Sequence, residues 1–252
     1  MTEAIPKETL HIIKQYFNLS LNGKKVHCPY YINVRKVRMG LRVLIGKGSP
    51  DEIIQESLIY EKLRNVDFKS MSIHEIREFL VKRHIGIECS GFICQVLDYM
   101  LRKQKKKHIW KYLIYPKTGI YRRIARFLRP IENIPAEMLT NDTNSKPVKN
   151  LNNMKPGDII RLKGLRGGYH VMLISRIKKE DGTIKEFEYV HATRWYNDQH
   201  GVRKGTVIVK DPKKRLSDQI WTDEYKGRNW TYEEVMKDSK YTQVRRLFRV
   251  FS

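Results

Sequence analysis

The chain has 252 residues, a formal net charge of +23 at pH 7 and a hydrophobic content of 40%. This apolar content is enough for a folded core, and no apolar run reaches the roughly 18–20 residues that a membrane-spanning helix needs. Three cysteines without paired spacing exclude a disulfide framework, and the spacing of Cys and His excludes a zinc motif. The positive charge favours a polyanionic partner, but it would also serve solubility alone.

The first 80 residues are interpreted as a helical N-terminal extension. A first helix is predicted to begin near Lys7, and a less clear segment suggests a helix over residues 33–45 that ends at Gly46. Two capping boxes, Ser49 to Glu52 and Ser72 to Glu75, predict two more helix starts. The N-terminus lacks the basic and apolar regions of a secretory signal, so a cytoplasmic location is the default expectation and a non-standard export route stays open.

The clearest helical pattern begins at Cys89. Apolar residues recur from there with the period of a helix over about three turns. They are Cys89, Phe92, Ile93, Val96, Leu97, Met100 and Leu101. The pattern therefore predicts a helix with Cys89 at the N-terminal edge of its buried face.

A strongly basic segment follows this helix. Residues 102–129 contain eleven Lys and Arg, no acidic residue, and interleaved Trp and Tyr. Cations at a helix C-terminus are often only a solvated end. Cations alternating with aromatic rings also suit contact with a polyanion such as single-stranded nucleic acid. The segment 140–153 is polar and is predicted to be a loop, so residues 102–154 are treated as a basic insertion.

After this insertion the pattern changes from helical to strand-like. Strands are predicted over residues 158–162, 169–176, 187–192, 206–209 and 244–251, and a helix is predicted to start at Thr231. Asp181-Gly182 predicts a hairpin turn. Helices followed by an antiparallel sheet describe an α+β fold. Residues 81–252 would form the principal domain.

Cys89, His170 and His191 form a candidate catalytic constellation. A helix N-terminus favours a thiolate at Cys89, because unpaired backbone N–H groups point toward it. His170 and His191 lie 11 residues before and 10 residues after Asp181, so a hairpin would bring them to the same end of two neighbouring strands. One histidine could then act as the base and the other as the group that orients it. Taken singly, a cysteine on an apolar helix face is more often a core residue.

Four segments in this order resemble the NlpC-type papain-like cysteine peptidases. They are GIECSGFICQVLD (86–98), KPGDIIRL (155–162), YHVMLI (169–174) and YVHAT (189–193). The resemblance covers roughly residues 84–210. It implies a papain-like α+β core in which the nucleophile helix packs on an antiparallel sheet, with Cys89 as nucleophile, His170 as base and His191 as orienting residue.

The resemblance also implies a function. Members of the family cleave amide bonds, commonly in peptidoglycan stem peptides, and need neither a metal nor an organic cofactor. Glu88 stands where the family usually has Asp, at a position associated with substrate binding, and Ser90 belongs to the same motif. Glu88 and the basic insertion are departures from the family pattern, and they leave the substrate open.

Three functions follow as hypotheses. The first is a cysteine hydrolase that cleaves an amide in a peptide or peptidoglycan-like substrate. An acyltransferase with the same residues is chemically adjacent, because an amine or alcohol could replace water. The alternative from another class is a non-catalytic binding module of the same fold, whose basic face binds nucleic acid or another polyanion.

Overall fold

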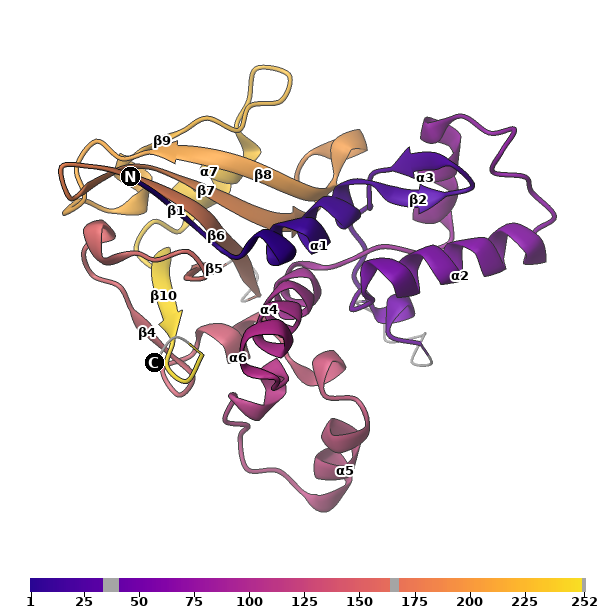
Figure 1. The fold of residues 1–252 in the computed structure, drawn as a ribbon, viewed down its shortest axis with the longest axis horizontal. Helices are drawn as coiled ribbons and strands as arrows, with labels where there is room; N and C mark the ends of the chain where they lie inside the picture. The colour runs from indigo at the N-terminus through magenta and orange to yellow at the C-terminus, as the bar shows by residue number, and fades with distance from the viewer. Residues whose placement is uncertain (34–40, 164–167, 251–252) are drawn as a thin grey trace.

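The computed structural model describes residues 1–33, 41–163 and 168–250, and within them the fold is α+β, as predicted (Figure 1). The N-terminal elements are β1 (Thr2–Ala4), α1 (Lys7–Phe17), β2 (Leu19–Leu21), β3 (Lys24–Val26), α2 (Pro50–Leu63) and α3 (Ile73–Lys82). The central elements are α4 (Cys89–Lys105), α5 (Ile120–Leu128), α6 (Ala136–Thr140) and β4 (Ser145–Pro147). The remaining elements are β5 (Ile159–Lys163), β6 (Tyr169–Glu180), β7 (Thr183–Thr193), β8 (Gly201–Ile208), β9 (Ile220–Trp221), α7 (Trp230–Lys237) and β10 (Gln243–Leu247).

The main sheet is built around the long β6–β7 hairpin. Its strand order is β4-β10-β5-β6-β7-β8-β9, and β1 pairs with β6 outside this path. The pairs between these strands are antiparallel. Asp181 and Gly182 form the predicted turn, with φ angles of 49° and 72°. Positive φ at both central residues matches the right-handed twist of the flanking strands, which explains why this dipeptide forms the tight turn.

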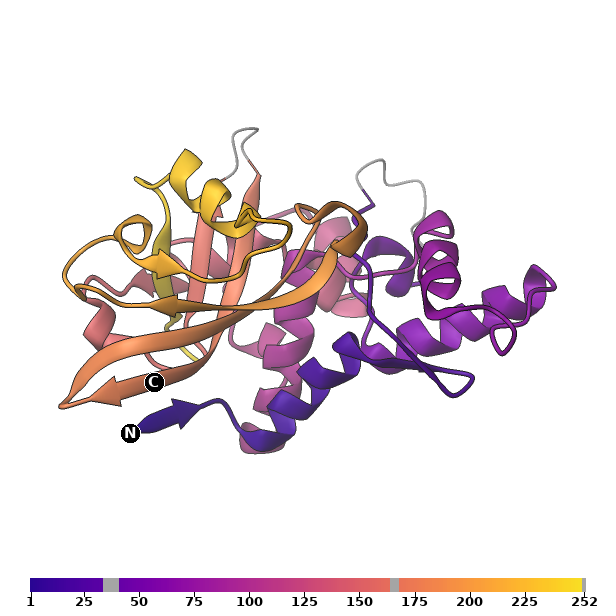
Figure 2. The same cartoon turned by 90° about the horizontal axis from the view of Figure 1, so that it is seen from above.

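Alternating residues of the hairpin bury both faces of the sheet. Val171 and Leu173 belong to one hydrophobic cluster, and Met172 and Ile174 belong to another. Successive strand side chains point to opposite faces, so the continuous apolar run of β6 fits a strand that is covered on both sides. Figures 1 and 2 show α4 against the first face and α7 on the other side of the sheet.

Helix α4 is the central helix of the first cluster. Its predicted apolar positions are buried, from Cys89 at 5% exposure to Leu101 at 0%. Helix α1 and the sheet pack against it, and the same cluster contains residues from Ile5 to Val250. Residues from the N-terminal segment 1–80 therefore contribute to the same core as α4.

The capping signals predicted two helix starts correctly. Ser49 accepts a hydrogen bond from the Glu52 N–H, Ser72 accepts one from the Glu75 N–H, and both capping boxes are complete. Gly46 does end a helical turn, with φ at 76°, but that turn is a short 3₁₀ segment, Val43–Ile45. Residues 34–40 of the helix predicted over 33–45 lie outside the described residues.

Several boundaries predicted from sequence differ from the structure. The strands predicted over 187–192 and 206–209 begin earlier, at Thr183 and Gly201. Helix α7 begins before Thr231, because the Asn229 side chain accepts a hydrogen bond from the Tyr232 N–H and caps the helix. The segment 140–153 is not only loop, since β4 within it pairs with β10. Its polar composition hid an edge strand, because an edge strand has less apolar surface to bury.

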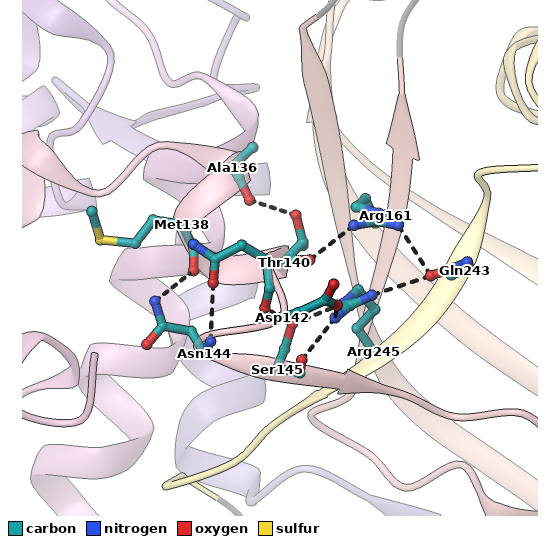
Figure 3. Close-up of polar contacts among 10 residues, drawn as sticks. Ala136, Met138, Thr140, Asp142, Asn144, Ser145, Arg161, Gln243 and Arg245 are labelled. Atoms are coloured by element: carbon teal, nitrogen blue, oxygen red, sulfur yellow. Dashed lines mark hydrogen bonds and ion pairs between the residues drawn. The ribbon is translucent and has the colours of Figure 1, made fainter. Parts of the chain in front are cut away.

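A buried polar network holds β4 and β10 beside α6 and β5 (Figure 3). Arg245, 2% exposed, donates to the Ser145 hydroxyl at 2.8 Å and the Ser145 carbonyl at 2.7 Å, and it also binds the Asp142 carboxylate. Arg161 donates to the Thr140 carbonyl at 3.0 Å. The Gln243 side-chain oxygen accepts from both arginines. The two guanidinium groups thus add side-chain hydrogen bonds that join this edge of the sheet to α6 and to the start of β4.

Among the described residues, none of the helices combines the length and apolar character that a membrane crossing requires.

We expect Arg245→Gln to lower the free energy of unfolding by about 2–3 kcal/mol, because the buried Ser145 hydroxyl and carbonyl lose charge-assisted hydrogen bonds. Urea denaturation followed by circular dichroism measures the change. Lys146→Gln, at an exposed position of neighbouring β4, is the matched control and should change stability little. Equal effects of the two substitutions would contradict a stabilising role for the network.

Candidate active site

Cys89 is the first residue of α4, and Glu88 caps the helix. The Glu88 carboxylate accepts hydrogen bonds from the backbone N–H groups of Ser90 at 2.9 Å and Gly91 at 2.7 Å. Two of the four N–H groups that a helix start leaves without partners are satisfied in this way. The cap fixes the point at which the helix begins, and therefore fixes the direction of the Cys89 side chain.

Lys47 holds the cap inside the protein. Its ammonium lies 2.5 Å from the Glu88 carboxylate and 2.8 Å from the Ile134 carbonyl oxygen, and it also donates to the Ser90 hydroxyl. The exposed fractions of Lys47, Glu88 and Ser90 are 6%, 6% and 2%. Burial alone would raise the pKa of Glu88, but Lys47 and the Ser90 hydrogen bonds hold that pKa below its usual value. Glu88 is therefore a buried carboxylate with a buried counter-ion.

Gly91 allows the Lys47 loop to approach α4. A Cβ at Gly91 would collide with the carbonyl oxygen of Gly46. The Glu88 N–H donates to that same carbonyl at 3.0 Å. Steric contact therefore explains why position 91 is a glycine, since any side chain there would push away the loop that carries Lys47.

The contacts of Glu88 and Ser90 point into the protein. Ser90 donates its hydroxyl proton to Glu88, and both side chains contact Lys47. These contacts show that Glu88 and Ser90 stabilise the start of α4 and its link to Lys47. The substrate-binding role that the resemblance implies for them stays a prediction.

His170 and His191 meet at the open end of the β6–β7 hairpin, as predicted. His170 Nε2 and His191 Nδ1 are 2.9 Å apart. His191 is fully buried. The Trp195 ring lies beside His170 with 4.4 Å between ring centroids. Packing by Trp195 and the hydrogen bond to His191 restrict the rotation of the His170 ring.

Val171 connects the histidine pair to Cys89. The Cα pairing of β6 with β7 runs from Glu180 and Thr183 to Leu173 and Val190, so Val171 lies beyond its last pair. Burial and Glu88 raise the pKa of the Cys89 thiol and the nearby Val171 backbone lowers it, while the hydrogen bond of the sulfur goes to Glu88 Oε2 at 3.5 Å. Cys89 therefore lies against the residue that follows His170.

Burial keeps all three candidate catalytic groups neutral at rest. Burial and the Glu88 charge raise the pKa of Cys89, and Val171 and Lys47 oppose them only in part. Desolvation lowers the pKa of His170 to about 3, and desolvation and His170 hold the pKa of His191 well below its usual value. The resting site thus holds a thiol and two neutral imidazoles rather than a thiolate–imidazolium pair.

One tautomer of the histidine pair suits base chemistry at Cys89. If the Nε2–H of His170 donates to His191 Nδ1, then His170 Nδ1 has a free lone pair that can accept a proton. In that state His191 orients the base and stabilises the positive charge that forms on it. Among the described residues, the hydrogen bond of the Cys89 sulfur goes to Glu88 Oε2 at 3.5 Å, so proton transfer from Cys89 to His170 stays a prediction.

Sequence reasoning missed two neighbours of this site. Lys47 gives no site prediction from sequence, because a lysine between two glycines is a weak signal for a buried ion pair. Trp195 follows the YVHAT segment by two residues, but no spacing rule linked it to His170. Within the ranges that the structure describes, no group of three or more His, Cys, Asp or Glu could hold a metal ion.

Comparison with protein-family models, with curated proteins and with solved structures finds no match for this chain.

We expect Lys47→Met to lower the free energy of unfolding by about 3–5 kcal/mol, because Glu88 would remain as a buried charge without its partner. Glu88→Gln added to Lys47→Met should restore part of the loss, since a neutral amide needs no counter-ion. A double-mutant cycle by chemical denaturation measures the coupling between the two side chains. Strictly additive losses would show that the pair is not coupled.

We also expect stability to fall as the pH falls below about 6.5. Burial lowers the folded-state pKa of His27 and His200 to about 4 and that of His170 to about 3. The unfolded chain takes up protons near 6.5 while these folded histidines do not, so acid favours unfolding down to their folded pKa values.

Denaturation across pH 7.5 to 4.5 measures this dependence. His27→Gln should reduce the proton uptake on unfolding near pH 5 by about one proton, whereas His74→Gln, at a side chain 72% exposed, should leave it unchanged. A melting temperature that does not vary between pH 7 and pH 4.5 would be inconsistent with lowered pKa values at these half-buried histidines.

Proposed function

We propose that this chain is a papain-like cysteine hydrolase that cleaves an amide bond. The observation that carries the proposal is the hydrogen bond between His170 and His191, on strands whose sheet packs against the helix that begins at Cys89. Helix α4 and strands β5 to β8 would form the NlpC-type core that the sequence motifs resemble. The motifs and this geometry support the same assignment of nucleophile, base and orienting residue.

In the proposed reaction, Cys89 transfers its proton to His170 Nδ1 as the sulfur attacks the amide carbonyl carbon. The His170 Nε2–H keeps its hydrogen bond to His191, which stabilises the imidazolium. The tetrahedral oxyanion accepts a hydrogen bond from the Cys89 backbone N–H at the start of α4. The C–N bond then breaks, the amine takes the proton from His170, and an acyl group remains on the sulfur. Water, deprotonated by His170, releases the acid and regenerates the thiol.

The neutral resting state fits this order of events. A buried thiol beside the Glu88 carboxylate ionises reluctantly, so proton transfer would accompany attack on the substrate rather than precede it. Because desolvation lowers the His170 pKa to about 3, the imidazole is unprotonated in the neutral range, and the charge that develops on bound substrate would have to raise this pKa for His170 to accept the thiol proton. Lys47 offsets part of the charge that Glu88 places next to the sulfur.

The same contacts bear on the substrate. In the family, the residue at the position of Glu88 is associated with substrate binding, but here the carboxylate is held by Lys47, Ser90 and two backbone N–H groups. A substrate amine would have to displace a buried lysine to reach it. We therefore propose a peptide-type amide, peptidoglycan-like or other, whose recognition does not depend on Glu88.

We expect Cys89→Ala to abolish hydrolysis of a responsive peptide amide, with a loss of at least ~10³-fold in kcat/KM, because the covalent step needs the sulfur. His191→Ala should retain the nucleophile and lose ~10²-fold through misorientation of His170. The measurement is amine release from a panel of muropeptides and other peptide amides. Intact-mass spectrometry on the millisecond-to-second scale should detect an acyl group on Cys89.

Cys94→Ala is the matched control, since Cys94 lies in the same helix and is fully buried. Its activity should stay within a few-fold of the unsubstituted chain. Acylation of Cys94, or turnover that survives Cys89→Ala, would refute the assignment. Adding a primary amine distinguishes hydrolysis from acyl transfer, because a transferase would form a new amide in place of the free acid.

A further inference from the structure

Helix α5 carries an apolar face that the described part of the chain leaves uncovered. None of its residues is buried. The apolar face consists of Ile120, Tyr121, Ile124, Phe127 and Leu128, which are 59%, 85%, 51%, 84% and 68% exposed. Figure 1 shows α5 at the end of the molecule that the C-terminus of α4 reaches, away from the sheet. An exposed cluster of this kind usually marks an interaction surface.

The opposite side of α5 is basic. With about 100° between successive residues, Ile120, Ile124 and Phe127 align on one side of the helix. Arg122, Arg123 and Arg126, the basic face, fall on the other. Within the part of the chain that the structure describes, neither Arg122 nor Arg123 forms an ion pair. The helix therefore presents one apolar and one cationic face to solvent.

The surrounding segment adds more positive charge and no negative charge. From Tyr99 to Ile131 the sequence contains no acidic residue. The exposed cations of the segment outside α5 are Arg102, Lys103, Lys105, Lys106, Lys107, Lys111 and Lys117. Arg126 joins α5 to the segment that precedes it. Its guanidinium donates to the Pro116 carbonyl at 3.0 Å and lies over the Tyr115 ring. The amphipathic face is thus held on an ordered, strongly cationic support.

We propose that α5 docks this protein on an anionic lipid surface. A helix lying in the plane of a membrane interface buries its apolar face at the boundary between headgroups and acyl chains, while its basic face stays among the headgroups. Cations near the surface add to this attraction when the lipids are anionic. Both requirements, apolar side chains to insert and cations to bind phosphate or carboxylate headgroups, are met within nine residues.

Two other occupants fit the same face less well. Nucleic acid would satisfy the arginines, but Ile120, Ile124 and Leu128 are aliphatic and cannot stack on bases. A second copy of the chain could cover the apolar face. That would bring two cationic surfaces together, and self-repulsion opposes such a contact. An anionic bilayer satisfies both the apolar and the basic side chains.

Vesicle co-sedimentation of the full chain tests the proposal. Vesicles of phosphatidylcholine and phosphatidylserine (three to one) are compared with pure phosphatidylcholine. The unsubstituted chain should bind the anionic vesicles, bind the neutral vesicles at least ~10-fold more weakly, and lose affinity as salt is raised. Ile124→Gln with Phe127→Gln should lower the partition coefficient at least ~10-fold, and so should Arg122→Gln with Arg123→Gln.

The controls are matched in exposure and charge but lie elsewhere. Ile59→Gln with Leu63→Gln changes two residues of α2 that are 49% and 70% exposed. Lys213→Gln with Lys214→Gln removes two exposed charges outside α5. Each control should keep anionic-vesicle binding within about threefold of the unsubstituted chain, since neither touches α5. Because the substituted α5 side chains are exposed, the melting temperature should also be unchanged.

Several results would overturn the proposal. One is equal binding to neutral and anionic vesicles, and another is binding that the α5 substitutions leave unaffected. A third is tight, α5-dependent binding of a single-stranded oligonucleotide without vesicle binding, which would make nucleic acid the partner. A dimer in analytical ultracentrifugation that dissociates with Ile124→Gln and Phe127→Gln, again without vesicle binding, would identify a second copy as the occupant.

Discussion

A buried ion pair between Lys47 and Glu88 determines where helix α4 begins. The carboxylate caps α4 through the Ser90 and Gly91 N–H groups, and the ammonium supplies the charge that lets this carboxylate stay ionised inside the protein. Cys89 is the first helical residue after the Glu88 cap. A shift of the cap by one residue would rotate the sulfur by about 100° around the helix axis. The orientation of the sulfur thus depends on a contact with a residue that is 42 positions earlier in the chain.

The second half of the candidate site depends on the β6–β7 hairpin. The tight turn at Asp181-Gly182 and the antiparallel register carry His170 and His191 to the same open end, where the strands separate. Cys89 reaches the β6 backbone at Val171, beyond the last pair of this hairpin. The helix and the hairpin therefore bring together groups that neither element could assemble alone. Burial at this junction raises the pKa of the Cys89 thiol and lowers that of the His170 imidazole, so both favour their uncharged forms.

Much of the fold could be predicted from local patterns. The capping boxes at Ser49 and Ser72, the apolar period after Cys89 and the Asp181-Gly182 turn depend on residues a few positions apart, and the structure confirms each of them. The predictions that failed concern elements that depend on contacts distant in the sequence. Strand β4 is stabilised by Arg245, about a hundred residues later, and its own polar sequence gives no strand signal.

The sequence by itself determined the α+β class, the position of Cys89 at a helix start and the juxtaposition of His170 with His191, because periodicity, capping and hairpin register are local properties. Only the tertiary structure decided the protonation states of these groups and the commitment of Glu88 to Lys47. Both follow from burial, which sets the desolvation cost of each charge and depends on segments distant in the chain. The same distinction applies to the basic segment 102–129. Its composition was evident at once, but the exposure of the apolar face of α5 appeared only when the rest of the chain was packed.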